Sequence, residues 1–276
     1  MMTPICVNRT FLLRTPLLRL LCSKTQKPNV KTAAVIVIGD EILNGEVLDT
    51  NSNYVAKTLH NLGVKLEKIS VIGDNIDEIA NETKLFSERY DYVITTGGIG
   101  PTHDDVTFTA IAKAFNEELL PHPTLVKVCS KFYNTTDLDA PGMKLCFIPA
   151  SAKLNFGDVK PGERKGYPNV SIKNVYIFPG IPQLLEKSLD MVAPKLFSSN
   201  NKFYKNKVYF NVTEQVILDV LNRLVEEFPD VMFGSYPELF NSTYKVKITI
   251  ESTNEEATTK ATKKLLESVP KDFLVK

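Results

Sequence analysis

Apolar and polar positions alternate along the first half of the chain in two different rhythms. Three segments predict strands: the apolar run at 33 to 38, followed by residues 64 to 72 and 91 to 96. Each predicted strand is followed by a segment with apolar positions at helical spacing: 51 to 62, 75 to 86 and 105 to 115. Apolar strands that alternate with helices are typical of parallel sheets. We therefore expect an α/β fold with a mostly parallel sheet, helices on both faces and right-handed crossovers.

The pattern becomes less regular after these segments. Residues 116 to 143 look helical and then turn-like, and an apolar strand is predicted at 144 to 149. A long loop rich in Gly, Pro and Lys follows at 151 to 170. The run VSIKNVYIF predicts one strand over 170 to 178, which leads through FPGIP into a helix over 183 to 196.

A polar segment, SSNNKFYK at 198 to 205, is the clearest boundary in the chain. Beyond it the order strand, helix, strand, strand, helix predicts a second, smaller α+β domain with two helices on a three-stranded sheet. The expected elements are KVYFNV, EQVILDVLNRLVEEF, VMFGSY, TYKVKITIES and EEATTKATKKLLESV. We therefore expect a leader at 1–31, an α/β domain at 32–200 and the small domain at 205–276.

Charge is unevenly distributed along the chain. The formal net charge is +1, yet six of the 33 basic residues and no acidic residue lie in the first 31 positions, so the remainder has an acidic excess. That excess argues against a nucleic acid partner. The Arg-rich, acid-free leader is typical of a mitochondrial presequence and predicts the mitochondrial matrix. A cytoplasmic protein with an untargeted leader is the alternative.

Two absences in the sequence narrow the class of protein further. No run of 18 apolar residues occurs, so neither a transmembrane helix nor a membrane partner is expected. The four cysteines form no CxxC pair: Cys6, Cys22, Cys129 and Cys146. Neither a zinc site nor a disulfide framework is therefore indicated.

The segment TTGGIGPTHDDVT directly follows the predicted strand at 91 to 96. Its candidate phosphate-binding residues are Thr96, Gly97, Gly98 and Gly100. They lie where an open α/β sheet binds ligands, and glycines let backbone N–H groups approach an oxyanion closely. Asp104 and Asp105 open the next helix in this prediction. Two acids beside an anion site repel the ligand unless a cation lies between them, so the segment indicates metal-assisted phosphate binding. A tight turn with an aspartate cap is the other interpretation.

A second polar cluster, GDEILNGEVLDTNSNYVA, follows the first predicted strand. Its candidate site residues are Gly39, Asp40, Glu41, Asp49, Thr50 and Asn51. Since neighbouring βα loops of a parallel sheet converge at one edge, Asp49 and Asp105 can face a common pocket. Two alternatives stay open: Asn51 or Ser52 is only the helix cap, and Asp40 and Glu41 are only solvated turn acids.

Three further features of the sequence give weaker evidence about the site. His103, beside the two aspartates, is a base, a metal ligand or a surface residue. Gly180 in FPGIP closes the pocket from another βα loop or makes a rigid strand-to-helix turn. Four basic residues of the 151 to 170 loop meet phosphates or stay solvated: Lys153, Lys160, Arg164 and Lys165.

Together these motifs resemble a known family. IVIGDEIL, GEVLDTNS and TTGGIGPTHDDVT are similar to the molybdopterin-binding domain family, shared by molybdenum-cofactor biosynthesis proteins of the MoaB and Mog type and by CinA-type proteins. FPGIPQLLEK and VMFGSYPELFNSTYKVKITIES resemble the N-terminal molybdopterin-binding half of eukaryotic FAD synthases more closely. The resemblance implies a three-layer α/β/α fold that is usually a homo-oligomer, with a nucleotide or pterin phosphate bound at the glycine-rich loop.

The resemblance also implies a choice of reactions. In the molybdenum-cofactor branch, two aspartates that match Asp49 and Asp105 serve adenylyl transfer to molybdopterin. The CinA and FAD-synthase branch is associated with hydrolysis of pyrophosphates such as ADP-ribose or FAD, which depends on a divalent metal ion. Both reactions fit a divalent metal (Mg, Mn or Co), with Asp49 and Asp105 as metal ligands or base and Asp104 in support.

Two departures from the relatives restrict the expected activity. The chain stops at Lys276, without the PAPS-reductase-type domain that forms FAD in the synthases and without the amidase domain of CinA proteins. We therefore expect an enzyme that hydrolyses FAD or ADP-ribose, a nucleotide pyrophosphatase rather than a synthase. The alternatives are a molybdopterin-binding or adenylyl-transfer protein and a non-catalytic module that binds flavin nucleotides.

Overall fold

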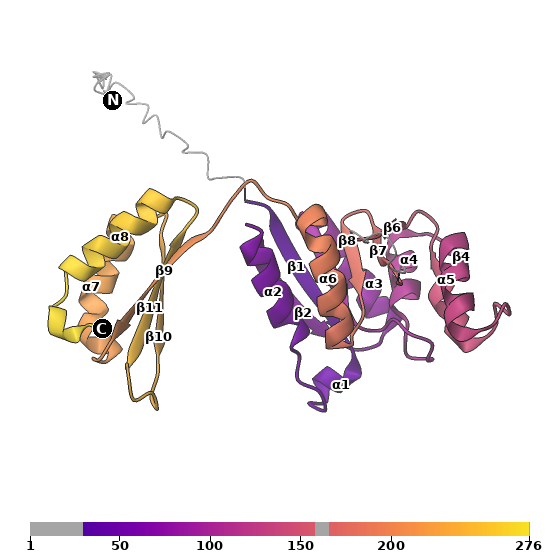
Figure 1. Cartoon of the computed structure of the whole chain (residues 1–276), viewed down its shortest axis with the longest axis horizontal. Coiled ribbons are helices and arrows are strands. Elements are labelled where there is room, and N and C mark those ends of the chain that lie inside the picture. Colours follow the sequence, from indigo (N-terminus) through magenta and orange to yellow (C-terminus); the bar gives the residue numbers. More distant parts are fainter. Residues whose placement is uncertain (1–29, 158–165, 276) are drawn as a thin grey trace, which may run out of the picture.

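The computed structural model describes residues 30–157 and 166–275. Its larger part is built on a six-stranded sheet with the strand order β2-β1-β3-β8-β7-β6 (Figure 1). Four neighbouring strands run parallel: β1 (Thr32–Ile38), β2 (Lys65–Ile72), β3 (Tyr92–Thr96) and β8 (Val175–Phe178). Antiparallel pairing then adds β7 (Asn169–Ile172) to β8, and β6 (Lys153–Asn155) to β7. The leader predicted at 1–31 lies almost wholly outside the described residues, as do Lys160, Arg164 and Lys165.

Strand β1 shows why the sheet is covered on both faces. Its apolar residues from Ala33 to Ile38 are at most 3% exposed. Alternate side chains enter two different cores, with Ile36 in one and Val35 in the other. The first core lies under α3 (Ile76–Arg89), α4 (Thr107–Phe115) and α5 (Pro123–Tyr133). The second lies under α2 (Asn51–Asn61) and α6 (Pro182–Leu196). The predicted three-layer α/β/α arrangement with a mostly parallel sheet is confirmed.

The single strand predicted over residues 170 to 178 is wrong, because this segment forms the β7–β8 hairpin. Lys173 and Asn174 make the turn, and Lys173 adopts the left-handed conformation with φ of 51°. Apolar residues continue on both sides of this polar pair, so the pattern concealed the turn. The Asn174 amide group binds outside the hairpin, donating to the carbonyl oxygens of Ser87 at 3.0 Å and Tyr90 at 2.8 Å.

Residues 116 to 149 also differ from the prediction. A short strand, β4 (Leu119–Pro121), precedes α5 and pairs antiparallel with β5 (Phe147–Pro149). The first part of the strand predicted at 144 to 149 instead belongs to the 3-10 helix η1 (Pro141–Cys146). The apolar stretch there is too short for periodicity to distinguish a strand from a helical turn.

Two boundaries near the glycine-rich loop differ as well. Helix α4 begins at Thr107 and not at Asp104 or Asp105. The reason is that the Asp105 carboxylate accepts a hydrogen bond from the Thr102 N–H at 2.8 Å, which keeps the segment in a loop. After β1, where a turn was expected, the chain forms the short helix α1 (Asp40–Leu43).

The C-terminal part is a three-stranded antiparallel sheet with the order β10-β11-β9 (Figure 1). Its strands are β9 (Tyr204–Phe210), β10 (Met232–Pro237) and β11 (Val246–Ser252). Its helices are α7 (Glu214–Glu227) and α8 (Glu255–Glu267), with the short η2 (Lys271–Phe273) near the end. One face of the sheet packs against α7 and α8 in a separate core. The predicted second, smaller α+β domain is thereby confirmed, whereas the exact limits at 32–200 and 205–276 stay predictions.

The two parts are in contact near the connecting segment. His60 of α2 lies 3.0 Å from the Glu251 carboxylate of β11 and stacks on Phe203 with 4.7 Å between ring centroids. Lys205 of β9 binds the other Glu251 oxygen at 2.9 Å. Within the described residues, no helix is long and apolar enough to cross a membrane.

Candidate functional site

The candidate site lies at the carboxyl edge of the parallel strands, the edge where α1 lies in Figure 1. Strands β1, β3 and β8 are neighbours in the sheet, so the loops that follow them meet there. Asn51 ties these loops together: its Nδ2 donates to Thr96 Oγ1 at 2.9 Å and to the Gly180 carbonyl oxygen at 2.7 Å. The Thr96 hydroxyl donates in turn to the Pro179 carbonyl oxygen at 3.0 Å. Three predicted site residues from distant positions are thus in direct contact.

The start of the glycine-rich loop can be built only from glycine. Gly97 and Gly98 have φ angles of 105° and 60°, in the region that side chains disfavour. A Cβ on Gly97 would overlap the Ile38 carbonyl oxygen, and one on Gly98 would overlap Thr107 Oγ1. The buried Thr107 fixes this turn through two hydrogen bonds. Its hydroxyl donates to the Gly97 carbonyl oxygen at 2.9 Å, and its backbone N–H donates to the Gly98 carbonyl oxygen at 3.0 Å.

Three successive backbone N–H groups in this loop are free. Those of Gly98, Ile99 and Gly100 donate to no acceptor among the described residues, whereas the Gly97 N–H donates to the Phe178 carbonyl oxygen at 3.2 Å. All three residues are half-buried. Successive unpaired amides at the end of a strand can bind an oxyanion. The predicted phosphate-binding role of this loop therefore has donors available.

Asn51 leaves one polar atom without a partner. The residue is 8% exposed, and its Oδ1 is buried with no hydrogen bond within the described part of the chain. Flipping the amide would place an oxygen against the Gly180 carbonyl oxygen, so the geometry favours Oδ1 as the free atom. Asn51 is not the cap of α2, contrary to one alternative. Thr50 occupies the cap position without a side-chain hydrogen bond.

The two aspartates predicted as metal ligands are each bound locally. Asp49 accepts from the Ser52 N–H at 3.0 Å and from the Ser52 hydroxyl, so it supplies the missing cap of α2. Asp105 accepts from Thr102, which holds its carboxylate over Gly100. Each carboxylate is fixed on one of two adjoining loops, yet no interaction among the described residues joins them.

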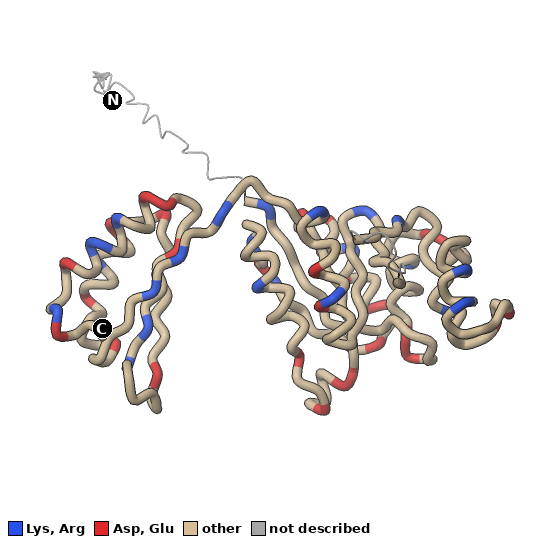
Figure 2. The backbone as a smooth tube through the Cα atoms, viewed as in Figure 1, with Lys and Arg blue, Asp and Glu red and all other residues tan. Residues whose placement is uncertain are grey.

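A different group of acids comes together around Asp74. The Asp74 carboxylate accepts from the Asp40 N–H at 3.0 Å. Burial raises its pKa, and the charges of Asp40, Glu41 and Asp104 raise it further. Figure 2 shows acidic residues gathered at this edge of the large sheet. Sequence reasoning missed Asp74, although it follows β2 as Asp40 follows β1. The same rule for strand ends would have found it.

Lys144 and Gly39 complete the surroundings of the loop. The Lys144 ammonium group donates to the Thr102 carbonyl oxygen, which places one cation beside the acids. The Thr102 hydroxyl, followed by the charges of His103 and Lys144, lowers the pKa of Asp104. Gly39 joins the ends of β1 and β2, because its N–H donates to the Ile72 carbonyl oxygen at 3.0 Å.

The acid set fits a metal ion that arrives with its ligand. No three His, Cys, Asp or Glu side chains are arranged as a metal cage in the described residues. Mg²⁺ does not need such a cage, because it usually binds one or two carboxylates together with substrate phosphates and water. His103 is almost fully exposed and lies 3.8 Å from Asp104, so it is a surface residue here. Lys153 lies on β6 at the far end of the sheet.

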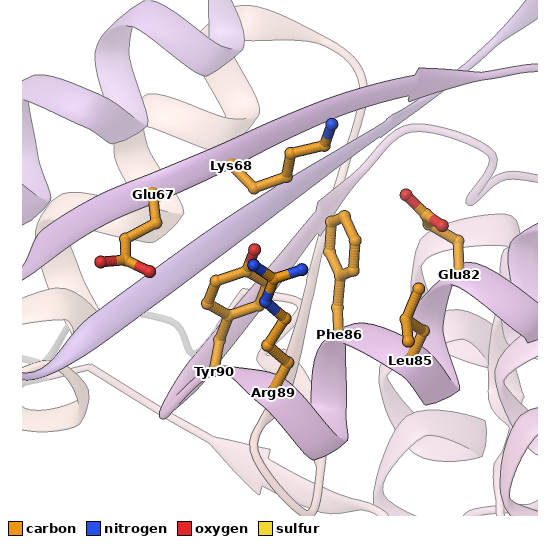
Figure 3. A pocket seen from close by; sticks show the side chains of 7 residues that line it. All are labelled: Glu67, Lys68, Glu82, Leu85, Phe86, Arg89 and Tyr90. Atoms are coloured by element: carbon orange, nitrogen blue, oxygen red, sulfur yellow. The ribbon is translucent and has the colours of Figure 1, made fainter.

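A surface pocket of about 430 Å³ lies elsewhere, between β2 and α3 (Figure 3). Its lining includes Glu67, Lys68, Glu82 and Arg89, whose charges balance. It is formed by the first half of β2 and the last turns of α3, away from the carboxyl edge. The free amides and the group of acids lie at the loop edge and not in this pocket.

Comparison with known proteins identifies two matching families. Residues 34–198 match the family described as "Probable molybdopterin binding domain", and residues 202–276 match "FAD synthase, middle domain". A "Probable FAD synthase" of Caenorhabditis elegans is 39% identical over an alignment of 249 residues that covers 83% of this chain and 48% of that protein. A "CinA-like protein" of Prochlorococcus marinus is 31% identical over 271 residues, or 91% of this chain and 59% of that protein.

A solved structure shows the same fold. The protein CinA from Thermoplasma acidophilum superimposes with a TM-score of 0.54 and 29% identity, covering 61% of this chain and 99% of that one. The chain spans about half the length of the FAD synthase relatives that it matches. The family match covers more than half of the chain and includes both loops of the site. The chain belongs to the molybdopterin-binding domain family and is related to FAD synthases and CinA-like proteins.

Proposed function

We propose that the glycine-rich loop binds the pyrophosphate group of a nucleotide such as FAD or ADP-ribose, and that the chain hydrolyses it with a divalent metal ion. The free N–H groups of Gly98, Ile99 and Gly100 beside a set of carboxylates carry the proposal. Phosphate oxygens accept hydrogen bonds from such amides. The carboxylates would repel the same phosphates without a cation between them.

The residues of the candidate site have separate roles in this proposal. Asp49 and Asp105 would hold the metal or act as base, with Asp104 in support, and the loop amides would stabilise the negative charge that develops on the phosphate oxygens. A divalent metal held there would supply positive charge against the phosphates and would activate water as the nucleophile. Asn51 and Thr96 keep the loop in place through their shared hydrogen bond. Attack of water on phosphorus breaks one P–O bond and gives two monophosphates, FMN and AMP when FAD is the substrate.

The test compares Asp105→Asn with the unchanged chain. Asparagine can still accept from Thr102, so the loop keeps its fold while the carboxylate charge is lost. We expect release of FMN from FAD in the presence of Co²⁺ or Mg²⁺, and a loss of at least about a hundredfold in kcat for the variant. The measurement is FMN formation over time, with ADP-ribose and NADH as further substrates.

Asp219→Asn on the exposed side of α7 is the matched control and should leave the rate unchanged. Absence of FMN release from the unchanged chain would contradict the proposal. So would full activity of Asp105→Asn, because the metal site would then lie elsewhere.

Molybdopterin binding is the second candidate, and the family match at residues 34–198 favours it. The same loop can bind the single phosphate of a pterin. Attack by that phosphate on the α-phosphorus of a nucleoside triphosphate, with pyrophosphate as the leaving group, would be adenylyl transfer. Molybdopterin that copurifies with the chain, together with no cleavage of FAD, would select this candidate. Tight flavin binding without metal-stimulated cleavage would instead indicate a non-catalytic module.

A further inference from the structure

The sheet of the small domain has one covered and one open face. The covered face carries Val208, Phe210, Ile248 and Ile250, which are at most 8% exposed and belong to the core with α7 and α8. Because side chains alternate along a strand, the residues between them lie on the opposite face. Figure 1 shows α7 and α8 together on one side of this sheet. Among the described residues, the opposite face carries no helix of the small domain, and it contacts the large part at Glu251, which binds His60.

A row of three residues crosses the open face from strand to strand. Tyr236 of β10 pairs with Lys247 of β11, which pairs with Tyr209 of β9. The Lys247 ammonium group lies 4.7 Å from the centroid of the Tyr236 ring. On the other side, the Tyr209 ring packs edge-on against Tyr244 at 4.8 Å. We name Tyr236, Lys247 and Tyr209, which are neighbours in strand register, the tyrosine-lysine row.

Gly234 allows one of these rings to lie along the sheet. A Cβ at this position would lie 2.8 Å from Tyr236 Cε2 and 2.7 Å from Thr249 Oγ1. No side chain other than hydrogen leaves room for the ring there. Tyr236 nevertheless stays 46% exposed, so its ring is presented at the surface and is not buried in a core.

The open face carries two lysines near the tyrosines that form no ion pair among the described residues. They are Lys247 in the row and Lys207 in the next row. Lys205, one row further, is different because Glu251 neutralises it and also contacts His60. The charge near the tyrosines is therefore uncompensated. Figure 2 shows the blue positions on these strands.

We propose that the tyrosine-lysine row is a second binding site, which takes a planar aromatic ring system that carries phosphate, such as a mononucleotide. Tyrosine faces stack on rings and an ammonium group attracts phosphate. Neighbouring strands are about 4.8 Å apart, so the row spans about 10 Å, the size of one ring system and not of several bases. This site is separate from the glycine-rich loop and goes beyond the proposed function.

The test uses flavin fluorescence with the full chain in EDTA, so that no metal-dependent turnover takes place. FMN and riboflavin share the ring and differ in the phosphate. We expect FMN to bind about tenfold more tightly than riboflavin at low salt. Lys247→Gln should abolish that preference, and Tyr209→Leu should weaken both ligands. Lys263→Gln on the exposed side of α8 is the control and should change neither.

Each outcome is decisive for the site. A preference for FMN that survives Lys247→Gln belongs to the glycine-rich loop and would overturn the proposal. Tighter binding of a single-stranded RNA than of FMN would also overturn it, as would a dimer that dissociates in Lys247→Gln. Circular dichroism of each variant shows that the fold is kept, and Lys247→Arg should retain the preference. Repeating the titration with Asp105→Asn separates the two sites, because that variant should bind FMN at the row as before.

Discussion

Asp74 is a residue at the loop edge whose ionisation is opposed by burial and by neighbouring negative charges. Its carboxylate is partly buried and faces the charges of Asp40, Glu41 and Asp104, so its pKa lies above the usual 3.8. A raised pKa means that ionisation costs the folded state more than the unfolded chain. The ionised Asp74 carboxylate therefore destabilises the fold at neutral pH.

We predict that Asp74→Asn stabilises the chain at neutral pH. Asparagine can still accept from the Asp40 N–H, while the repulsion is removed. The gain is about 0.5 kcal/mol in the free energy of unfolding, since most of the group is exposed and screened by solvent. The full gain in the free energy of unfolding should be present above the raised pKa of Asp74, and it should vanish as the pH falls below 3.8. Urea unfolding across this range measures it, and equal stability at pH 7 would show that no repulsion exists.

At the scale of elements, the β7–β8 turn holds the end of α3. Asn174 donates to the Ser87 and Tyr90 carbonyl oxygens and accepts from the Ser87 hydroxyl at 2.5 Å. Carbonyl groups at the end of a helix have no partner within it, so these bonds replace the missing ones. The hairpin thereby fixes the position of the helix beside β3.

We predict that Asn174→Ala lowers the free energy of unfolding by about 2 to 3 kcal/mol, because two carbonyl groups lose their donor in a half-buried place. Guanidinium unfolding measures the difference. Asn61→Ala is the matched control, since Asn61 is exposed near the end of α2 and should cost less than about 0.5 kcal/mol. Equal effects of the two substitutions would show that the turn does not support α3.

At the scale of the whole molecule, Glu251 joins the two parts of the chain. Burial acts to raise its pKa, but hydrogen bonds from Lys205 and His60 outweigh burial and lower it below the usual 4.5. A lowered pKa stabilises the folded state above the unfolded value, and this stability is lost as the pH falls through the folded pKa. The contact between the two parts therefore depends on an ionised Glu251 carboxylate.

We predict that Glu251→Gln destabilises the protein by about 1 kcal/mol at pH 7, and that the difference shrinks as the pH falls below 4.5. Thermal unfolding at several pH values follows the change. Glu267→Gln, at an exposed position of α8, should have no measurable effect. A constant difference between Glu251→Gln and the unchanged chain at all pH values would contradict the electrostatic explanation.

The sequence alone determined the main architecture of this protein. Strong apolar runs such as 33 to 38 specify buried parallel strands, because only a sheet covered on both faces hides every side chain. The rule for strand ends directed attention to Thr96, Asn51 and Gly180, which the structure brings into contact. Where the pattern was weak, as at 116 to 149 and in the β7–β8 turn, local apolarity could not define the elements.

Only the tertiary structure decided how the site residues are used. Sequence cannot show that Asp105 turns back to Thr102, that Asp49 caps α2, or that Asp74 joins the acids near Asp104. It also cannot align Tyr236, Lys247 and Tyr209, since strand register depends on pairing between distant segments. The physical reason is common to these cases. Hydrogen-bond partners and neighbouring charges are set by the distances between loops, and those distances exist only after the chain has folded.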